Sequence, residues 1–191
     1  MPIEYWWPTP IYYSQFDEDS SLLDEVSAEV DSAILTTPTH NPWGEAKIQT
    51  SFLYDATNLF LDRTPKLKKY INKHIKNYTE IDFFISESWI NIGGSGARQE
   101  KHMHLRSEIS GCYYHKTNTL DGAIVFECND KMLQKFSGSN ITSIEYQPEL
   151  GKIILFPSYL THSVKTNQTE DDRISIAFNI RTTEIEAHWK C

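Results

Sequence analysis

Short β-type segments fill the chain from Ile81 onward, and no helical pattern interrupts them. They are rich in Ile, Phe, Tyr, Trp and Val and are divided by turns of Gly, Asn and Asp, which is the pattern of strands. Consecutive short strands without intervening helices indicate a sandwich or a jelly roll. We therefore expect a mainly β fold of one of these two kinds. The expected strands cover residues 82–92, 99–104, 109–116, 122–128, 143–147, 151–156, 162–166 and 173–182.

The first eighty residues carry helical patterns instead. Ser21 can cap a helix whose apolar residues fall on one side. Thr64-Pro65 predicts a second helix start, with Thr as N-cap and Pro in the first turn. We expect these helices to cover one sheet and leave the barrel mouth open. Residues 1–191 would then form one domain, with a helical layer at 1–80 and a jelly-roll core at 81–182.

The charge balance restricts the partners of the chain. Its formal charge is −8, from 18 basic and 26 acidic residues. Proteins that bind nucleic acids more often carry a basic excess, so no nucleic-acid partner is expected. No stretch approaches the roughly 20 apolar residues that span a bilayer, so no membrane partner is expected either.

The cysteines and the first residues bear on the compartment. Cys112, Cys128 and Cys191 form no CxxC pair, which speaks against a zinc ribbon or a disulfide framework. Residues 1–10 lack the basic and apolar stretches of a signal peptide. We expect reduced thiols, with Cys112 and Cys128 as small core residues, in a cytoplasmic setting, which is the host cytoplasm if the protein is viral.

Three segments carry side chains that could meet in one site. His102 and His104 stand at i and i+2, so on a strand they would point to the same side. His162 follows an apolar run that ends in a turn. Arg173 and Ser175 share one face of the last expected strand. Taken singly, each has a structural alternative: a surface histidine pair, a core histidine and a surface ion pair.

A metal ion with open coordination positions would use this set. Three imidazoles on one face of an octahedron leave three positions, two for a bidentate 2-oxo acid and one for O₂. Arg173 offers a planar fork for a distal carboxylate. Tyr114 and Ser175 could add hydroxyl donors to the same carboxylate.

The order of these segments resembles that of a family of 2-oxoglutarate/Fe(II) oxygenases found in marine bacteria and tailed phages, which is distantly similar to prolyl hydroxylases. The resemblance covers roughly residues 85–180, with a weaker echo at Pro8–Ile11. It rests on Gln99–His104, Ser110–Tyr114, Gly151–Pro157, His162–Val164 and Arg173–Asn179.

The resemblance implies roles for four residues. His102 and His162 match the two metal-binding histidines, and Arg173 matches the basic residue that pairs with the C5 carboxylate of 2-oxoglutarate (2OG). Tyr114 matches a tyrosine that often hydrogen-bonds the same group. The implied fold is a double-stranded β-helix (jelly roll, cupin-like) with supporting N-terminal α-helices. The implied cofactors are Fe(II) and 2OG as cosubstrate, and O₂ is the implied co-reactant.

The chain departs from the wider superfamily at His104, where Asp or Glu is usual. A neutral imidazole there leaves Fe(II) its full charge, offset mainly by the 2OG dianion. Imidazole suits Fe(II), so His102, His104 and His162 are the expected metal ligands. Two alternatives stay open: Glu108 could swing in as a carboxylate ligand, or His104 could hydrogen-bond cofactor or substrate from outside the coordination shell.

Further candidates surround the expected mouth. Trp89 and Asn91 share one strand face. Each also has a structural alternative: Trp89 as an aromatic residue of the core, and Asn91 as an amide whose hydrogen bonds are made within the fold. We expect Asn91 on the cofactor, and Trp89, Gln99 and Arg106 on the substrate.

The expected activity is that of a 2OG-dependent non-haem iron hydroxylase that releases succinate and CO₂. Its primary substrate is not readable from the sequence. A peptidyl side chain such as proline is suggested by fold analogy alone. Two rivals remain: a three-histidine cupin dioxygenase that does not use 2OG, and a non-catalytic jelly-roll structural or interaction protein.

Overall fold

The strands form two facing sheets, and from β3 onward most consecutive strands lie in different sheets. The computed structural model describes residues 9–16, 20–54, 56–128 and 142–183. From β3 to β10 the chain passes back and forth between a six-stranded and a four-stranded sheet, with one hairpin, β6–β7, inside the smaller one. All ladders between the named strands are antiparallel. This connectivity is that of a double-stranded β-helix, and it confirms the expected fold class.

The larger sheet has the order β1-β8-β5-β10-β3-β2. Its centre is β10, which pairs with β3 along its whole length and with β5 on the other side. The strands are β1 (Tyr12–Ser14), β2 (Ile48–Thr50), β3 (Phe83–Gly93), β5 (Ile109–Lys116), β8 (Ile153–Pro157) and β10 (Arg173–Thr182).

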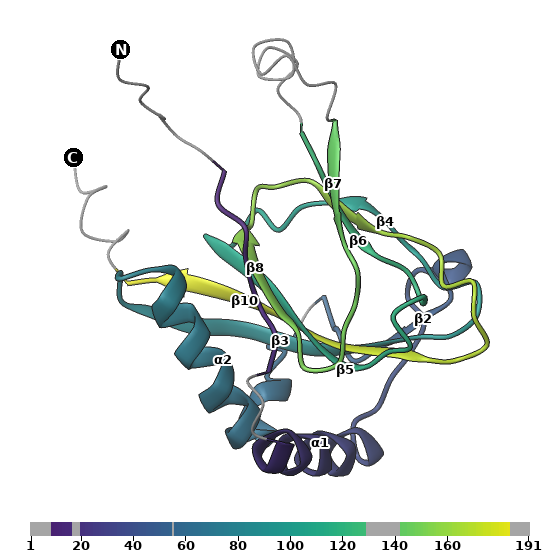
Figure 1. Cartoon of the computed structure of the whole chain (residues 1–191), viewed down its shortest axis with the longest axis horizontal. Helices are drawn as coiled ribbons and strands as arrows, with labels where there is room; N and C mark the ends of the chain where they lie inside the picture. The colour runs from purple at the N-terminus through teal and green to yellow at the C-terminus, as the bar shows by residue number, and fades with distance from the viewer. Residues whose placement is uncertain (1–8, 17–19, 55, 129–141, 184–191) are drawn as a thin grey trace.

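The smaller sheet has the order β4-β9-β6-β7. Its strands are β4 (Gln99–His102), β6 (Ile124–Glu127), β7 (Ser143–Tyr146) and β9 (His162–Val164). It faces the inner side of the larger sheet (Figure 1). Side chains from both sheets line the cavity between them.

Two helices lie on the outer side of the larger sheet (Figure 1). They are α1 (Ser20–Leu35) and α2 (Pro65–Tyr78), and two short 3₁₀ turns, Gly44–Ala46 and Phe60–Arg63, lie in the chain between them. Their apolar faces share one core with that side of the sheet. Fully buried members of this core include Val26, Val30, Leu67, Ile71, Ile75, Ile90, Ile153, Ile176 and Phe178.

The expected helices are present, but their caps differ in detail. α1 begins at Ser20, so Ser21 lies inside the helix and is not its cap. Thr64 is the N-cap of α2 and Pro65 its first residue, as expected, yet the Thr64 hydroxyl makes no capping hydrogen bond. None of the helices in the described ranges is long and apolar enough to cross a bilayer.

The expected strands match best in the centre of the larger sheet, where β5 and β10 have the predicted bounds. Two strands were not expected: β1 and β2 lie in the part of the chain predicted as a helical layer. Each is three residues long, too short for an alternating pattern to show. The strand expected at 99–104 ends at His102, so His104 lies beyond it.

Candidate active site

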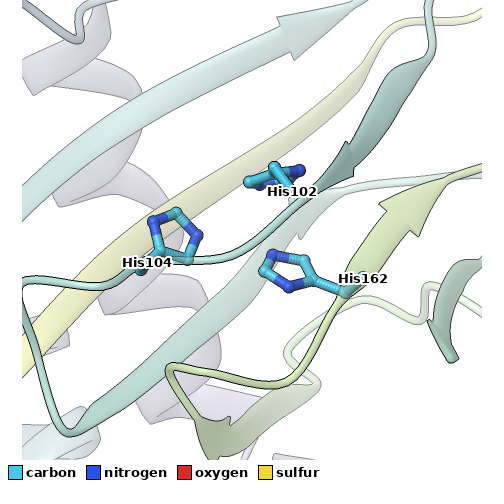
Figure 2. Close-up of side chains that lie close together, drawn as sticks. All are labelled: His102, His104 and His162. Atoms are coloured by element: carbon cyan, nitrogen blue, oxygen red, sulfur yellow. The ribbon is translucent and has the colours of Figure 1, made fainter. Parts of the chain in front are cut away.

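Three histidines bring their rings together between the two sheets. The potential ligand atoms of His102, His104 and His162 all lie within 4.8 Å of one another. Ring centroids are 4.2 Å apart for His102 and His162, and 5.1 and 5.2 Å apart for His104 with each of them. Figure 2 shows the three imidazoles facing a common point.

The smaller sheet positions two of these rings. His102 on β4 is the direct cross-strand neighbour of His162 on β9. Each ring is oriented by its Nδ1 atom, which lies 2.8 Å from the carbonyl oxygen of Glu100 for His102 and 2.9 Å from that of Leu160 for His162. A carbonyl oxygen only accepts, so Nδ1 is the protonated nitrogen and Nε2 keeps a free lone pair.

His104 reaches the cluster from the segment after β4. Its backbone N–H donates to the carbonyl oxygen of Ser158, at 2.9 Å, which ties this segment to the turn before β9. Its ring lies 5.9 Å from the Trp89 ring. His102 and His104 were expected to meet because both would lie on one face of a strand. Their rings do meet, but His104 lies beyond the strand, so that reason is wrong.

Burial keeps the three imidazoles neutral. Desolvation is the main cause in each case, and it lowers the pKa of His104 to about 4 and that of His162 to about 3. It lowers the pKa of His102 as well. Neutral imidazole is the form that binds a metal ion, so the set is ready to coordinate at neutral pH.

The histidines stand in the wall of a cavity of about 690 Å³. The inner face of the larger sheet supplies its opposite wall, with Arg173, Ser175 and Ala177 on β10 and Asn91 and Trp89 on β3. Gln99, Tyr114 and Arg106 also line it. Every site residue predicted from the sequence thus borders one cavity.

Arg173 is the buried cation of this cavity. It is 5% exposed, and its Nη1 donates to the carbonyl oxygens of Asp121 and Gly122, the latter at 3.1 Å. Within the described ranges, no carboxylate forms an ion pair with it. A buried charge without a counter-ion is costly, so the guanidinium is suited to an anionic ligand.

The two hydroxyl candidates lie beside this cation. Ser175 and Tyr114 are cross-strand neighbours on β10 and β5, and both line the cavity. The Tyr114 ring is buried, which raises the pKa of its phenol well above the usual value, so it stays a hydrogen-bond donor. The Asn91 side chain, one strand away, hydrogen-bonds the Thr50 hydroxyl at 2.8 Å.

One alternative is corrected: Glu108 is no reserve ligand, because its carboxylate accepts the backbone N–H of Thr182 at 3.0 Å and does not line the cavity. Cys112 packs against a buried hydrophobic cluster, as expected, and it also lines the cavity, where burial raises the pKa of its thiol to about 12. Cys128 is half-buried, and Cys191 lies outside the described residues.

Several cavity residues were not predicted. Glu87 and Asn179 border it at the end far from Arg173, and Phe52, Tyr54 and Trp43 border it from the chain around β2. Asn179 is the last residue of Arg173–Asn179, one of the segments on which the resemblance rests. This was the only indication in the sequence that Asn179 could belong to the site. The aromatic residues stand in the region predicted as helical and loop, where alternation gave no hint of a cavity wall.

The residues present fit the two cofactors implied by the resemblance. Three neutral imidazoles with free Nε2 atoms suit a divalent first-row metal and leave its cavity side open. The unpaired guanidinium and the neighbouring hydroxyls suit a carboxylate at the far end of a short dianion.

Comparison with known families supports this assignment. Residues 87–179 match the model of a family described as "Putative 2OG-Fe(II) oxygenase". That description names both expected cofactors, Fe(II) and 2OG. No protein with curated annotation gives a significant match.

Solved structures of the same fold include several 2OG oxygenases. HygX from Streptomyces hygroscopicus with nickel and 2OG bound has 13% identity and a TM-score of 0.64, covering 92% of this chain and 84% of that one. A Pseudomonas putida prolyl-4-hydroxylase has 14% identity and a TM-score of 0.61, covering 91% and 93%.

A third similar structure has a peptide bound. It is a Trichoplax adhaerens prolyl hydroxylase in complex with a hypoxia-inducible-factor peptide, with 14% identity and a TM-score of 0.66, covering 95% of this chain and 87% of that one. The segment that holds the histidine cluster and Arg173 thus matches the 2OG-Fe(II) oxygenase family, and the fold around it is the fold of solved 2OG oxygenases.

Proposed function

We propose that this protein is an Fe(II)- and 2OG-dependent dioxygenase that hydroxylates its primary substrate. The observation that carries the proposal is the pairing of two features in one cavity. One is the cluster of three neutral imidazoles, and the other is the buried, unpaired Arg173. A metal ligand set alone would fit many metalloproteins, but the guanidinium adds a place for the distal carboxylate of 2OG.

The proposed reaction balances as substrate C–H, O₂ and 2OG giving substrate C–OH, succinate and CO₂. Bound Fe(II) would supply the redox chemistry that couples the decarboxylation to oxygen insertion, with His102, His104 and His162 as its ligands. The backbone carbonyls of Glu100 and Leu160 hold two of these rings in place through Nδ1.

The remaining residues position the organic reactants. Arg173 binds the C5 carboxylate of 2OG, and the hydroxyls of Tyr114 and Ser175 donate hydrogen bonds to it. Asn91 contacts the metal-side end of 2OG or the substrate. Trp89, Gln99 and Arg106 contact the substrate, with Trp89 shielding the reacting atoms from water.

A peptide is the proposed substrate class, and proline is one candidate side chain. Two observations support a peptide: exposed apolar residues around the mouth, among them Tyr54, Met103 and Leu105, and the peptide-bound prolyl hydroxylase of the same fold. The cytoplasmic location, the lack of nucleic-acid and membrane partners, and a source in phages or marine bacteria stay predictions of the sequence.

Succinate formation tests the proposal. Purified protein supplied with Fe(II), 2OG and air should release succinate slowly without any added substrate, and His162→Ala should abolish this release. The cupin rival predicts that Arg173→Ala keeps full turnover. The non-catalytic rival predicts that no metal binds and that His162→Ala changes stability alone. Either result would contradict the proposal.

A further inference from the structure

The cavity extends past the histidines to a carboxylate that none of the roles above uses. Along β10 its wall runs from Arg173 to Asn179, and along β3 from Asn91 to Glu87. Six residues of strand separate the two ends, which is about 20 Å at the usual rise. The Arg173 end suits 2OG, so the Glu87 end is left for the primary substrate.

A β-bulge places Glu87 in the cavity. Asn179 pairs with Glu87, but the next residue, Ile180, pairs with Ile85, so Ser86 is an extra residue in β3. Before the bulge, Phe83 and Ile85 pack against the core under the helices; after it, Ile90 and Ile92 do so. In a regular strand Glu87 would share the face of Ile85 and lie in that core.

Buried polar groups then hold the carboxylate. Glu87 Oε2 accepts a hydrogen bond from Asn179 Nδ2 at 3.0 Å. Asn179 Oδ1 accepts one from the Ser110 hydroxyl at 2.9 Å, and that hydroxyl lies 2.7 Å from the Ser158 hydroxyl. These three supporting residues are buried, while Glu87 itself is half-buried. Within the described part of the chain, Glu87 has no ion pair, so its charge is open to a ligand.

Aromatic rings line the cavity beside this carboxylate. Phe52 lies 5.0 Å from Trp89 and 5.1 Å from Tyr54, centroid to centroid. The Trp43 indole N–H donates to the Tyr54 hydroxyl at 2.9 Å, which adds a fourth ring. All four border the cavity. A carboxylate next to aromatic faces is a binding environment for an organic cation.

We infer that the primary substrate carries an ammonium or guanidinium group, which binds between Glu87 and the rings of Trp89 and Phe52. The inference rests on the proposed function for the position of the reacting carbon. The other charged groups that line the cavity do not neutralise the Glu87 carboxylate. Arg173 is assigned to 2OG, and Arg106 is exposed at the mouth, where water screens its charge. For a peptide substrate, the group is a lysyl or arginyl side chain, which this inference favours over proline.

Peptide titrations test the inference. The probes are N-acetyl-Gly-Xaa-Gly-amides with Lys, Arg, norleucine or Pro at Xaa, titrated calorimetrically into full-length protein loaded anaerobically with Fe(II) and 2OG. We expect the Lys and Arg peptides to bind about tenfold or more tightly than the norleucine and Pro peptides. Equal binding of the uncharged peptides would overturn the inference, as would no saturable binding of the cationic ones up to about 10 mM.

Matched variants locate the effect. Glu87→Gln keeps an oxygen for the Asn179 amide and removes the charge, so the preference for cations should vanish. Phe52→Leu should reduce it in part, because it removes a π-face at similar volume. Glu145→Gln, an exposed position on β7, should leave it unchanged. A preference that survives in Glu87→Gln would contradict the inference.

A failure of the proposed function can be distinguished from a failure of this inference. Binding of 2OG is measured first on the wild-type sample. If 2OG does not bind, the same peptides are titrated into metal-free protein, where the cation preference is still expected, because Glu87 and the rings do not depend on the metal.

Discussion

At the scale of single residues, the site differs from the usual superfamily pattern in one ligand. His104 stands where a carboxylate is usual, and with His102 and His162 it forms a set of three neutral donors. In the proposed complex these ligands would add no charge, so the charge of the metal would be balanced mainly by 2OG. Metal retention would then depend on all three rings.

Substitution of His104 tests its place in the ligand set. His104→Ala should lower Fe(II) affinity by at least about tenfold, the loss that even an outer partner of a metal ligand can cause. His104→Asp should retain Fe(II) binding, because it restores the usual carboxylate. Anaerobic calorimetry measures both affinities, with exposed His40→Ala as the control. Unchanged affinity in His104→Ala would show that His104 does not coordinate the metal.

Substitution of Arg173 tests the carboxylate site. Arg173→Ala should weaken 2OG binding by roughly ten- to a hundredfold, because a charge-assisted hydrogen bond contributes about 1.5–3 kcal/mol. Exposed Arg181→Ala, on the same strand, should leave 2OG binding unchanged. Equal losses in both variants would mean that Arg173 does not contact 2OG.

At the scale of elements, turns and a bulge position the groups that the strands carry. Gly122, with φ of +103°, precedes β6 and packs against Arg173: a Cβ there would come 2.2 Å from the Lys165 carbonyl oxygen and 2.8 Å from Arg173 Nη1. No side chain fits without moving the guanidinium. The glycine is therefore part of what fixes the carboxylate site.

Gly122→Ala should weaken 2OG binding and lower the melting temperature. Both effects follow from the displaced guanidinium and from the left-handed backbone, which costs an L-residue about 1–2 kcal/mol. Gly44→Ala is the matched control, because φ is +50° there but nothing lies within 4 Å of the new Cβ. It should cost stability alone. Calorimetry and thermal unfolding separate the two, and intact 2OG binding in Gly122→Ala would contradict this role.

The elements also show what a sequence can reveal. β10 was predictable because Ile174, Ile176 and Phe178 alternate along it with other residues, and β5 because it is a short β-type segment bounded by loops. His102, His162 and Arg173 were singled out by their order and spacing along the chain. Glu87 was not predictable, because one bulge residue exchanges the two faces of a strand without any local signal. β2 and the aromatic residues after it gain their place only through pairing with β3, a contact between segments distant in sequence.

At the scale of the whole molecule, the two sheets enclose one cavity whose two ends differ in charge. Arg173 lies at one end, the proposed site of 2OG, and Glu87 with its aromatic neighbours lies at the other, the proposed cation site. The histidine cluster contributes to the wall between these ends. The helices α1 and α2 pack against the outer side of the larger sheet and leave the cavity open. In the proposed complex, cosubstrate and substrate would lie along one axis on either side of the metal.

Anaerobic titration with Fe(II) and then 2OG tests the central claim most directly. If three imidazoles hold Fe(II) and Arg173 anchors 2OG beside it, a visible metal-to-ligand charge-transfer band should appear and saturate with one 2OG per chain. Folded protein that binds Fe(II) but shows no band on addition of 2OG, or that binds no Fe(II), would contradict the account.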